Sequence, residues 1–146
     1  MTKNLEQDYS KELLRDNDSN IIPTASQVLA VKNAIIDPET GITPANTPDS
    51  YVIVAAPTAV SSDFTFSSLS PSTEAMQTAI TNTLTDYFKS DSVAEGVDIS
   101  QNEYNALIYS VIDADGNSPT FTLSTPSANI FVNEGELATL GAVTYS

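Results

Sequence analysis

The chain has 146 residues, 40% of them hydrophobic, which suits one domain with a buried core. It contains no cysteine and no histidine, so thiol nucleophiles, disulfides, imidazole bases and the usual zinc ligands are all excluded. Its net charge of −14 argues against binding to nucleic acid or to an anionic membrane, because such a surface repels phosphate. These features favour a non-enzymatic protein without a cofactor, a catalytic residue or a metal site.

The negative charge is distributed unevenly along the chain. Residues 1–32 hold four basic and five acidic side chains, for a net charge of −1, whereas residues 33–146 hold Lys89 and fourteen acids, for −13. Two interpretations stay open: an ordinary solvated surface, or a surface complementary to a basic neighbour in an assembly. No apolar run approaches the ~20 residues that a membrane helix requires, so no membrane partner is expected.

Residues 1–20 are polar and are expected to form an arm ahead of a single domain, residues 21–146. Within the arm, Leu5, Tyr9, Leu13 and Leu14 recur at spacings of 4, 4 and 1. That pattern suits a short amphipathic helix, which is marginal in water when isolated. We expect the arm to become ordered on a partner, with Tyr9, Leu13 and Leu14 as contact residues.

Three helices are predicted, and the first and third open with capping boxes. Thr24 and Gln27 have the required spacing in the first helix, which Pro38 ends, and Ser100 and Glu103 have it in the third. Apolar residues at helical spacing follow each box: Val28, Val31 and Ile35 in the first helix, and Tyr104, Leu107, Ile108, Val111 and Ile112 in the third.

The second helix is expected to run from Ser70 and Pro71 to about Lys89. Ser70 suits the N-cap, Pro71 suits the first helical position, and Lys89 lies at the end where a cation is favoured. One apolar stripe with four-residue spacing consists of Met76, Ile80, Leu84 and Phe88.

Strand patterns occupy much of the remaining chain. A continuous β-favouring run, residues 51–54, indicates burial on both faces or a place in the interior of a sheet, and Phe64 and Phe66 alternate with polar residues. Shorter candidates are residues 120–123, 130–132 and 142–145. Because each helix has one apolar face, the fold class is expected to be α+β, with two to three helices packed on one face of a small, mainly antiparallel sheet.

Several surface positions are candidate contact residues. Ile42 and Pro44 lie in a proline-punctuated connection, and such loops often carry recognition. Tyr109 falls off the apolar stripe of the third helix and is either a contact anchor or a rim residue. Glu134 and Glu136 flank Gly135; they suit an exposed turn that touches a neighbour, since a catalytic carboxylate pair requires burial to separate the two pKa values.

Two further patterns are compared with known kinds of site, a calcium loop and a serine nucleophile. Asp113, Asp115 and Asn117 have the first three spacings of a calcium loop, but the positions where an EF-hand has Gly and Glu hold Ser118 and Ser124. An ordinary turn after a helix is therefore favoured over a metal site. The serine pairs at 61–62 and 67–68 have no histidine and no S-x-x-K spacing to activate them, so no nucleophile is predicted.

Four segments, in order, resemble the baseplate J-like family of contractile-tail phages. They are IIPTASQVLAVKNAI (21–35), DSYVIVAAPTAVSSDFTFSSLSP (49–71), Gly-Val-Asp-Ile-Ser (96–100) and GELATLGAVTYS (135–146). The resemblance covers residues 20–146 and rests on packing and turn patterns. Members of the family are usually longer, so the chain is similar to their C-terminal portion only.

This resemblance implies a structural subunit of a baseplate wedge. Such a subunit contacts other wedge and hub proteins in a sixfold ring, is assembled in the host cytoplasm and resides in the tail of the virion. The alternative from another class is a carbohydrate- or cell-surface-binding module of a phage tail. That alternative is disfavoured because the chain has no tryptophan for a sugar platform.

Overall fold

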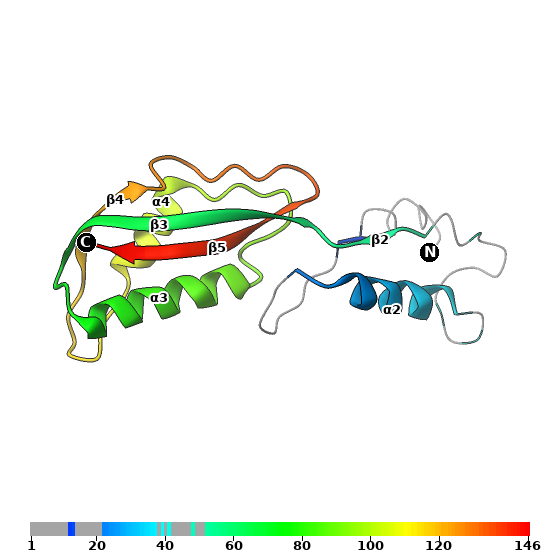
Figure 1. Cartoon of the computed structure of the whole chain (residues 1–146), viewed down its shortest axis with the longest axis horizontal. Coiled ribbons are helices and arrows are strands. Elements are labelled where there is room, and N and C mark those ends of the chain that lie inside the picture. Colours follow the sequence, from blue (N-terminus) through cyan, green and yellow to red (C-terminus); the bar gives the residue numbers. More distant parts are fainter. Residues whose placement is uncertain (1–11, 14–21, 38, 40, 42–47, 49–51) are drawn as a thin grey trace. The chain divides into compact units, whose positions relative to one another are not determined.

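The computed structural model of the chain describes residues 12–13, 22–37, 39, 41, 48 and 52–146. Backbone contacts divide the chain into two compact units, Met1–Thr58 and Ala59–Ser146 (Figure 1). The expected boundary between an arm, residues 1–20, and a single domain, residues 21–146, stays a prediction.

In its described residues, the first unit contains a two-stranded parallel sheet and one helix. Strand β1 (Glu12–Leu13) pairs with β2 (Val54–Ala55), so these two residues of the expected arm are extended rather than helical. Helix α2 (Ala25–Ile36) packs on β2. Its predicted capping box is confirmed, because Thr24 N–H donates to Gln27 Oε1 at 2.7 Å and Gln27 N–H donates to Thr24 Oγ1 at 3.3 Å.

The run that leads into β2 is buried on one side only. Val52 and Val54 are buried, whereas Ile53 between them is 51% exposed. The expectation of burial on both faces was therefore wrong at Ile53, because the described residues do not cover its side chain. None of the side chains of α2 is fully buried.

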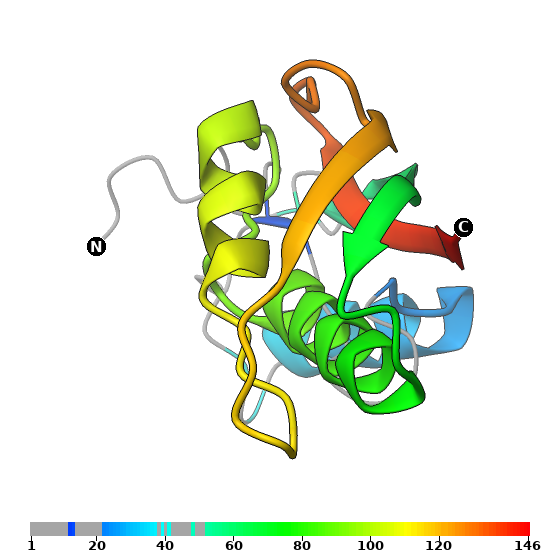
Figure 2. The same ribbon diagram turned by 90° about the vertical axis from the view of Figure 1, so that its left-hand side faces the viewer.

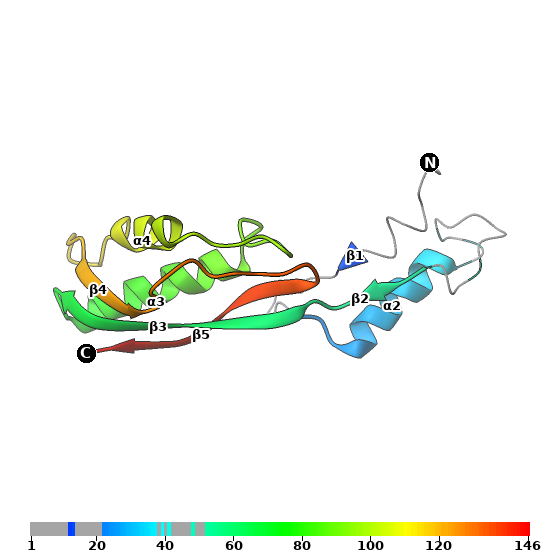
Figure 3. The ribbon, with the colours of Figure 1, turned by 90° about the horizontal axis from the view of Figure 1, so that it is seen from above.

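The second unit is a three-stranded sheet covered by two helices. The strand order is β4 (Thr120–Thr125), β3 (Thr58–Ser70), β5 (Glu136–Tyr145), with β4 antiparallel to β3. Strand β5 runs in the same direction as β3, so the sheet is mixed rather than purely antiparallel (Figure 1). Helices α3 (Glu74–Lys89) and α4 (Gln101–Tyr109) lie on the same face of it (Figures 2 and 3). The α+β class is confirmed.

The start of α3 differs from the prediction. The N-cap is Thr73, whose Oγ1 accepts from Met76 N–H at 3.2 Å, and not Ser70. Ser70 is the last residue of β3 and pairs with Thr120, so the sheet ladder extends the strand over the residues that resembled a helix start. The predicted stripe is confirmed: Met76, Ile80, Leu84 and Phe88 are all buried, and Lys89 ends the helix.

Helix α4 has the predicted capping box and ends earlier than expected. Glu103 N–H donates to Ser100 Oγ at 3.1 Å, and Ser100 N–H donates to Glu103 Oε2 at 3.4 Å. The helix stops at Tyr109, after which Ser110 N–H bonds back to the carbonyls of the last turn. Ile112 is 59% exposed, so its predicted place on the apolar face was wrong because helical spacing no longer applies there.

The last strand is longer than the pattern of alternation indicated. Strand β5 begins at Glu136 instead of residue 142, and Leu137 and Ala138 are both buried. The candidate strand at 130–132 is reduced to one bridge, in which the N–H groups of Ile99 and Ile130 donate to each other's carbonyls at 3.0 and 2.8 Å.

Three aromatic rings join the sheet to both helices at the centre of the core. Phe64 of β3 meets Phe88 of α3 edge-on, with ring centroids 5.9 Å apart, and Tyr104 of α4 at 5.6 Å. The Tyr104 hydroxyl donates to the carbonyls of Ala128 (2.9 Å) and Pro126 (3.2 Å), which satisfies its polar end. The core of this unit therefore depends on contacts between residues far apart in the sequence.

One buried and two half-buried tyrosines give the fold a predicted sensitivity to alkali. Burial raises the pKa of Tyr104, Tyr145 and Tyr87, and the hydrogen bond and charge of Glu103 raise the pKa of Tyr87 further. A raised pKa in the folded state means that the folded chain holds the proton more tightly than the unfolded chain. Its stabilising contribution is complete below the unfolded pKa of about 10 and is lost as the pH rises through the folded pKa.

We therefore expect the urea midpoint of unfolding to decrease as the pH rises from about 9 to about 11. The Tyr104→Phe variant removes one of these groups, so its midpoint should start lower and fall less steeply. A midpoint that stays constant over this range in the unmodified protein would contradict the prediction.

Candidate subunit-contact surface

The predicted contact residues Glu134 and Glu136 lie in a tight turn that leads into β5. Gly135 has φ +85°, a conformation that favours glycine, and Glu136 N–H donates to the Asn133 carbonyl at 3.0 Å. The Glu136 carboxylate accepts from the Asn133 backbone N–H at 2.9 Å and from its side-chain amide at 3.0 Å. Glu136 therefore stabilises the turn, and Glu134 lies exposed on its surface.

The turn is fastened to the segment that precedes α4. Gly135 N–H donates to Glu95 Oε1, Gly96 N–H donates to the Glu136 carbonyl at 3.0 Å, and Val132 N–H donates to Asp98 Oδ1 at 2.7 Å. Together with the bridge at Ile99, these bonds pair the two loops along their length. The turn that carries Glu134 is therefore held in place by hydrogen bonds to Glu95, Gly96 and Asp98 of the neighbouring loop.

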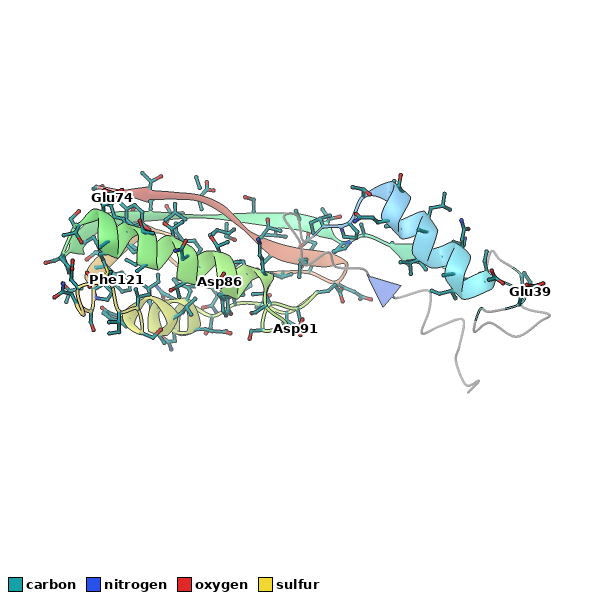
Figure 4. All side chains as sticks on the ribbon, turned by 90° about the horizontal axis from the view of Figure 1, so that it is seen from below. Glu39, Glu74, Asp86, Asp91 and Phe121 are labelled. Carbon is teal, nitrogen blue, oxygen red and sulfur yellow. The ribbon has the colours of Figure 1, made fainter. Side chains whose placement is uncertain are left out.

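Tyr109 lies on the surface at the end of α4. Its side chain is 54% exposed, and its ring centroid lies 4.5 Å from that of Phe121 in β4. Phe121 in turn meets the buried ring of Phe66 edge-on at 5.7 Å. Figure 4 labels Phe121 at the end of the unit where α3 begins with Glu74. The Tyr109 ring is thus exposed on one side and supported by Phe121 on the other, which suits either a contact anchor or a rim residue.

The Asp113 carboxylate is used by the turn that follows α4. Asp113 Oδ1 accepts from the N–H groups of Asn117 (2.8 Å) and Asp115 (2.9 Å), and Oδ2 accepts from the Asn117 side-chain amide at 3.3 Å. The backbone N–H of Asn117 is the main cause of a lowered pKa for Asp113, which burial partly opposes. Among the described residues, no group of three acidic side chains is placed to hold a metal ion.

The lowered pKa of Asp113 predicts a sensitivity to acid. The stabilising contribution is present above the unfolded pKa of about 3.9 and is lost as the pH falls through the folded pKa. We expect Asp113→Asn to lower the thermal midpoint at neutral pH and to reduce the fall of that midpoint in acid. Identical pH profiles for the variant and the unmodified chain, measured by circular dichroism, would show that this carboxylate has no such role.

The other predicted contact residues fall largely outside the described residues. Tyr9, Leu14, Ile42 and Pro44 are not described, and for Leu13 only the backbone is described, in β1. No helix in the described part of the chain is both long enough and apolar enough to cross a lipid bilayer.

One polar contact holds the middle of β5 against β3. Asp63 Oδ1 accepts from Ala142 N–H at 2.8 Å. The carboxylate occupies the space beside Gly141, where an added Cβ would overlap Asp63 Oδ1 and lie 2.8 Å from Ser61 Oγ. Gly141 is therefore required by the close approach of a side chain rather than by a turn.

These turns, the paired loops and all of the mixed sheet except the first five residues of β3 lie within the segment that matches a known family. Residues 63–146 match the family model described as Baseplate J-like protein C-terminal domain. The chain belongs to the baseplate J-like family. No curated protein matches the chain. The family supports a structural role in the phage tail baseplate, a location in the virion tail and contact with other baseplate proteins, and it points to a non-enzymatic protein.

The family match includes two of the four resembling segments completely and a third in part. The matched baseplate J-like region contains the 96–100 and 135–146 segments, and it begins at Asp63, inside the 49–71 segment. The likeness of residues 21–35 to the family lies outside the match and stays a prediction. Within the matched region of this baseplate domain, Gly96 and Gly135 have positive φ angles, and Gly141 allows the close approach of the Asp63 side chain.

Sequence reasoning missed three acidic side chains that organise this baseplate domain. Asp63, Glu95 and Asp98 each accept from a backbone N–H far along the chain, at Ala142, Gly135 and Val132 respectively. Asp63 and Asp98 both lie within segments that resemble the family, but a resemblance based on packing and turn patterns gave no sign of their hydrogen bonds. For Asp63, the one hint was a single charge inside a strand of serine, threonine and phenylalanine.

Proposed function

We propose that this chain is a wedge component of a contractile-tail baseplate that makes protein–protein contacts with neighbouring wedge and hub proteins in a sixfold assembly. The observation that carries the proposal is the baseplate J-like match over residues 63–146. The predicted contact residues are Tyr9, Leu13, Leu14, Ile42, Pro44, Tyr109, Glu134 and Glu136.

The described contact residues suit this role for two physical reasons. Tyr109 offers a large aromatic side chain of the kind that is enriched at interface centres, and Phe121 holds its ring in place. Glu134 adds negative charge to a turn that is already rigid, so little conformational entropy is lost when a basic neighbour binds there.

Co-expression with the tail proteins of the same phage genome tests the proposal. The chain should enter a stoichiometric complex with at least one wedge or hub protein and remain in it through gel filtration. Tyr109→Ala should weaken that complex, whereas Ile112→Ala, which also shortens an exposed apolar side chain near the end of α4, serves as the matched control. Failure of the chain to co-purify with any tail protein would count against the proposal.

A further inference from the structure

Two exposed apolar side chains lie on the paired loops, one on each loop. Phe131 is 67% exposed and Val97 is 51% exposed, and no other large hydrophobic side chain of the described residues is more exposed than Phe131. The loops run side by side (Figure 3), and a hydrogen bond of 2.7 Å joins the residue after Val97 to the residue after Phe131. We call the exposed parts of residues 95–98 and 131–134 the loop surface.

The backbone holds Phe131 in an outward orientation. Its neighbours Ile130 and Val132 are only 7% and 4% exposed, because successive side chains of an extended segment point to opposite sides. Hydrogen bonds also fix both neighbours: Ile130 N–H donates to the Ile99 carbonyl at 2.8 Å, and Val132 N–H donates to Asp98 Oδ1. Phe131 is therefore an aromatic anchor that is already oriented, and a partner that covers its ring immobilises little backbone.

Carboxylates border this aromatic anchor on both loops. Asp98 and Glu134 are exposed, and Glu95 is half-buried. Asp98 and Glu95 accept hydrogen bonds from backbone N–H groups of the opposite loop, which are neutral, so these bonds leave the negative charges in place. Residues 90–146 contain eight acidic residues and neither lysine nor arginine. The electrostatic potential at the loop surface is therefore negative, and it attracts cationic side chains.

We propose that the loop surface binds a different protein of the baseplate, through a patch in which lysine or arginine residues border an apolar pocket for Phe131. The apolar ring supplies the part of the contact that excludes water, as buried aromatic anchors do at the centres of interfaces. The carboxylates lie around it, where pairing with cations selects the partner and speeds its approach. The inference rests on the proposed function, because it gives the chemistry of one partner of the baseplate subunit.

A basic protein suits this surface better than other occupants do. A second copy of the chain would place an equally acidic surface against Glu95, Asp98 and Glu134, because a twofold contact brings identical surfaces together. Anionic lipids and nucleic acids carry phosphate groups, which the same carboxylates repel. A cationic protein is attracted to the carboxylates and removes the exposed Phe131 ring from water in the same contact.

Photocrosslinking identifies the occupant of the loop surface directly. The full chain with Phe131→p-benzoylphenylalanine is expressed together with the tail proteins of the same phage genome, irradiated, and analysed by mass spectrometry. We expect a crosslink to another tail protein, in a segment that contains lysine or arginine. Thr122→p-benzoylphenylalanine, which places the same group at an exposed position of β4, should not form that crosslink and serves as the control.

Removal of the Phe131 ring tests its role as the anchor. Phe131→Ala should raise the dissociation constant of the complex with that tail protein by about tenfold or more. Ile112→Ala, which shortens another exposed apolar side chain, should leave the dissociation constant unchanged. The thermal midpoints of both variants show whether they are folded.

Removal of one charge tests the role of the carboxylates. Asp98→Asn keeps an oxygen that can accept from Val132 N–H, so the loops stay paired while the negative charge is lost. It should weaken the complex several-fold at about 0.01 M salt and much less at about 0.1 M, where salt screens the charge. Glu74→Gln makes an equal change of charge at the start of α3 and should have little effect at either salt concentration.

Three results would overturn this inference alone. These are a crosslink from residue 131 to nothing or only to a second copy of the chain, a crosslinked segment without lysine or arginine, and a complex that Phe131→Ala and Ile112→Ala affect alike. Each of them leaves the baseplate role intact, because the chain still co-purifies with a tail protein. If the chain co-purifies with no tail protein, the baseplate role and this inference both fail.

Discussion

Replacing Phe64 with alanine is expected to lower the free energy of unfolding by about 3–5 kcal/mol. Phe64 is fully buried and its ring contacts Phe88 of α3 and Tyr104 of α4, so its loss leaves a cavity at the junction of the sheet and both helices. Since domains are stable by only about 5–15 kcal/mol, this single change should remove a large part of the total.

Urea unfolding followed by circular dichroism measures the effect. Phe64→Leu, which keeps most of the volume, should cost clearly less, and Ser68→Ala at an exposed position of the same strand should change the stability by less than about 0.5 kcal/mol. A Phe64→Ala variant as stable as the Ser68→Ala control would mean that the described packing of the two helices on β3 is wrong.

Gly141→Ala is expected to destabilise the chain by about 1–3 kcal/mol, although the change adds a single methyl group. The added Cβ would overlap Asp63 Oδ1, so the carboxylate must move and its hydrogen bond to Ala142 N–H is lost. Thr144→Ala on the same strand is exposed and should have little effect, and it serves as the control.

A double-mutant cycle separates this steric cause from a general effect on the strand. Asp63→Ala alone should cost about 0.5–1.5 kcal/mol, because Ala142 N–H loses its acceptor. In the Asp63→Ala background, Gly141→Ala should cost much less than in the unmodified chain, since Ser61 Oγ can rotate away. Strict additivity of the two changes would contradict the assigned contact.

Local patterns predicted the helices well because their causes are local. The capping boxes at Thr24 and Ser100 involve residues three positions apart, and the stripe from Met76 to Phe88 repeats on one helix face. The α+β class followed from these stripes, since each apolar face requires a sheet to cover it.

The errors arose where distant contacts decide the conformation. Ser70 suited a helix N-cap, but pairing with Thr120, fifty positions along the chain, keeps it in β3. The early start of β5 and the role of Asp63 depend on the placement of β5 beside β3, which no local pattern contains. The parallel direction of β5 requires the long connection through α3, α4 and β4, but that connection alone does not determine it.

The contact residues were the least predictable part, for a different physical reason. A contact residue is defined by the surface of another molecule. The sequence around an exposed side chain such as Tyr109 therefore does not show whether a partner covers it. The Glu134–Glu136 pair shows the same difficulty, because Glu136 also has a structural task in its turn.

The most direct test of the central claim is the protein content of purified virions of the phage that encodes this chain. If the chain is a baseplate subunit, quantitative mass spectrometry should find it in every virion at a copy number that is a multiple of six, and immunogold labelling should place it at the baseplate end of the tail. Absence from virions that contain their other baseplate proteins would contradict the claim.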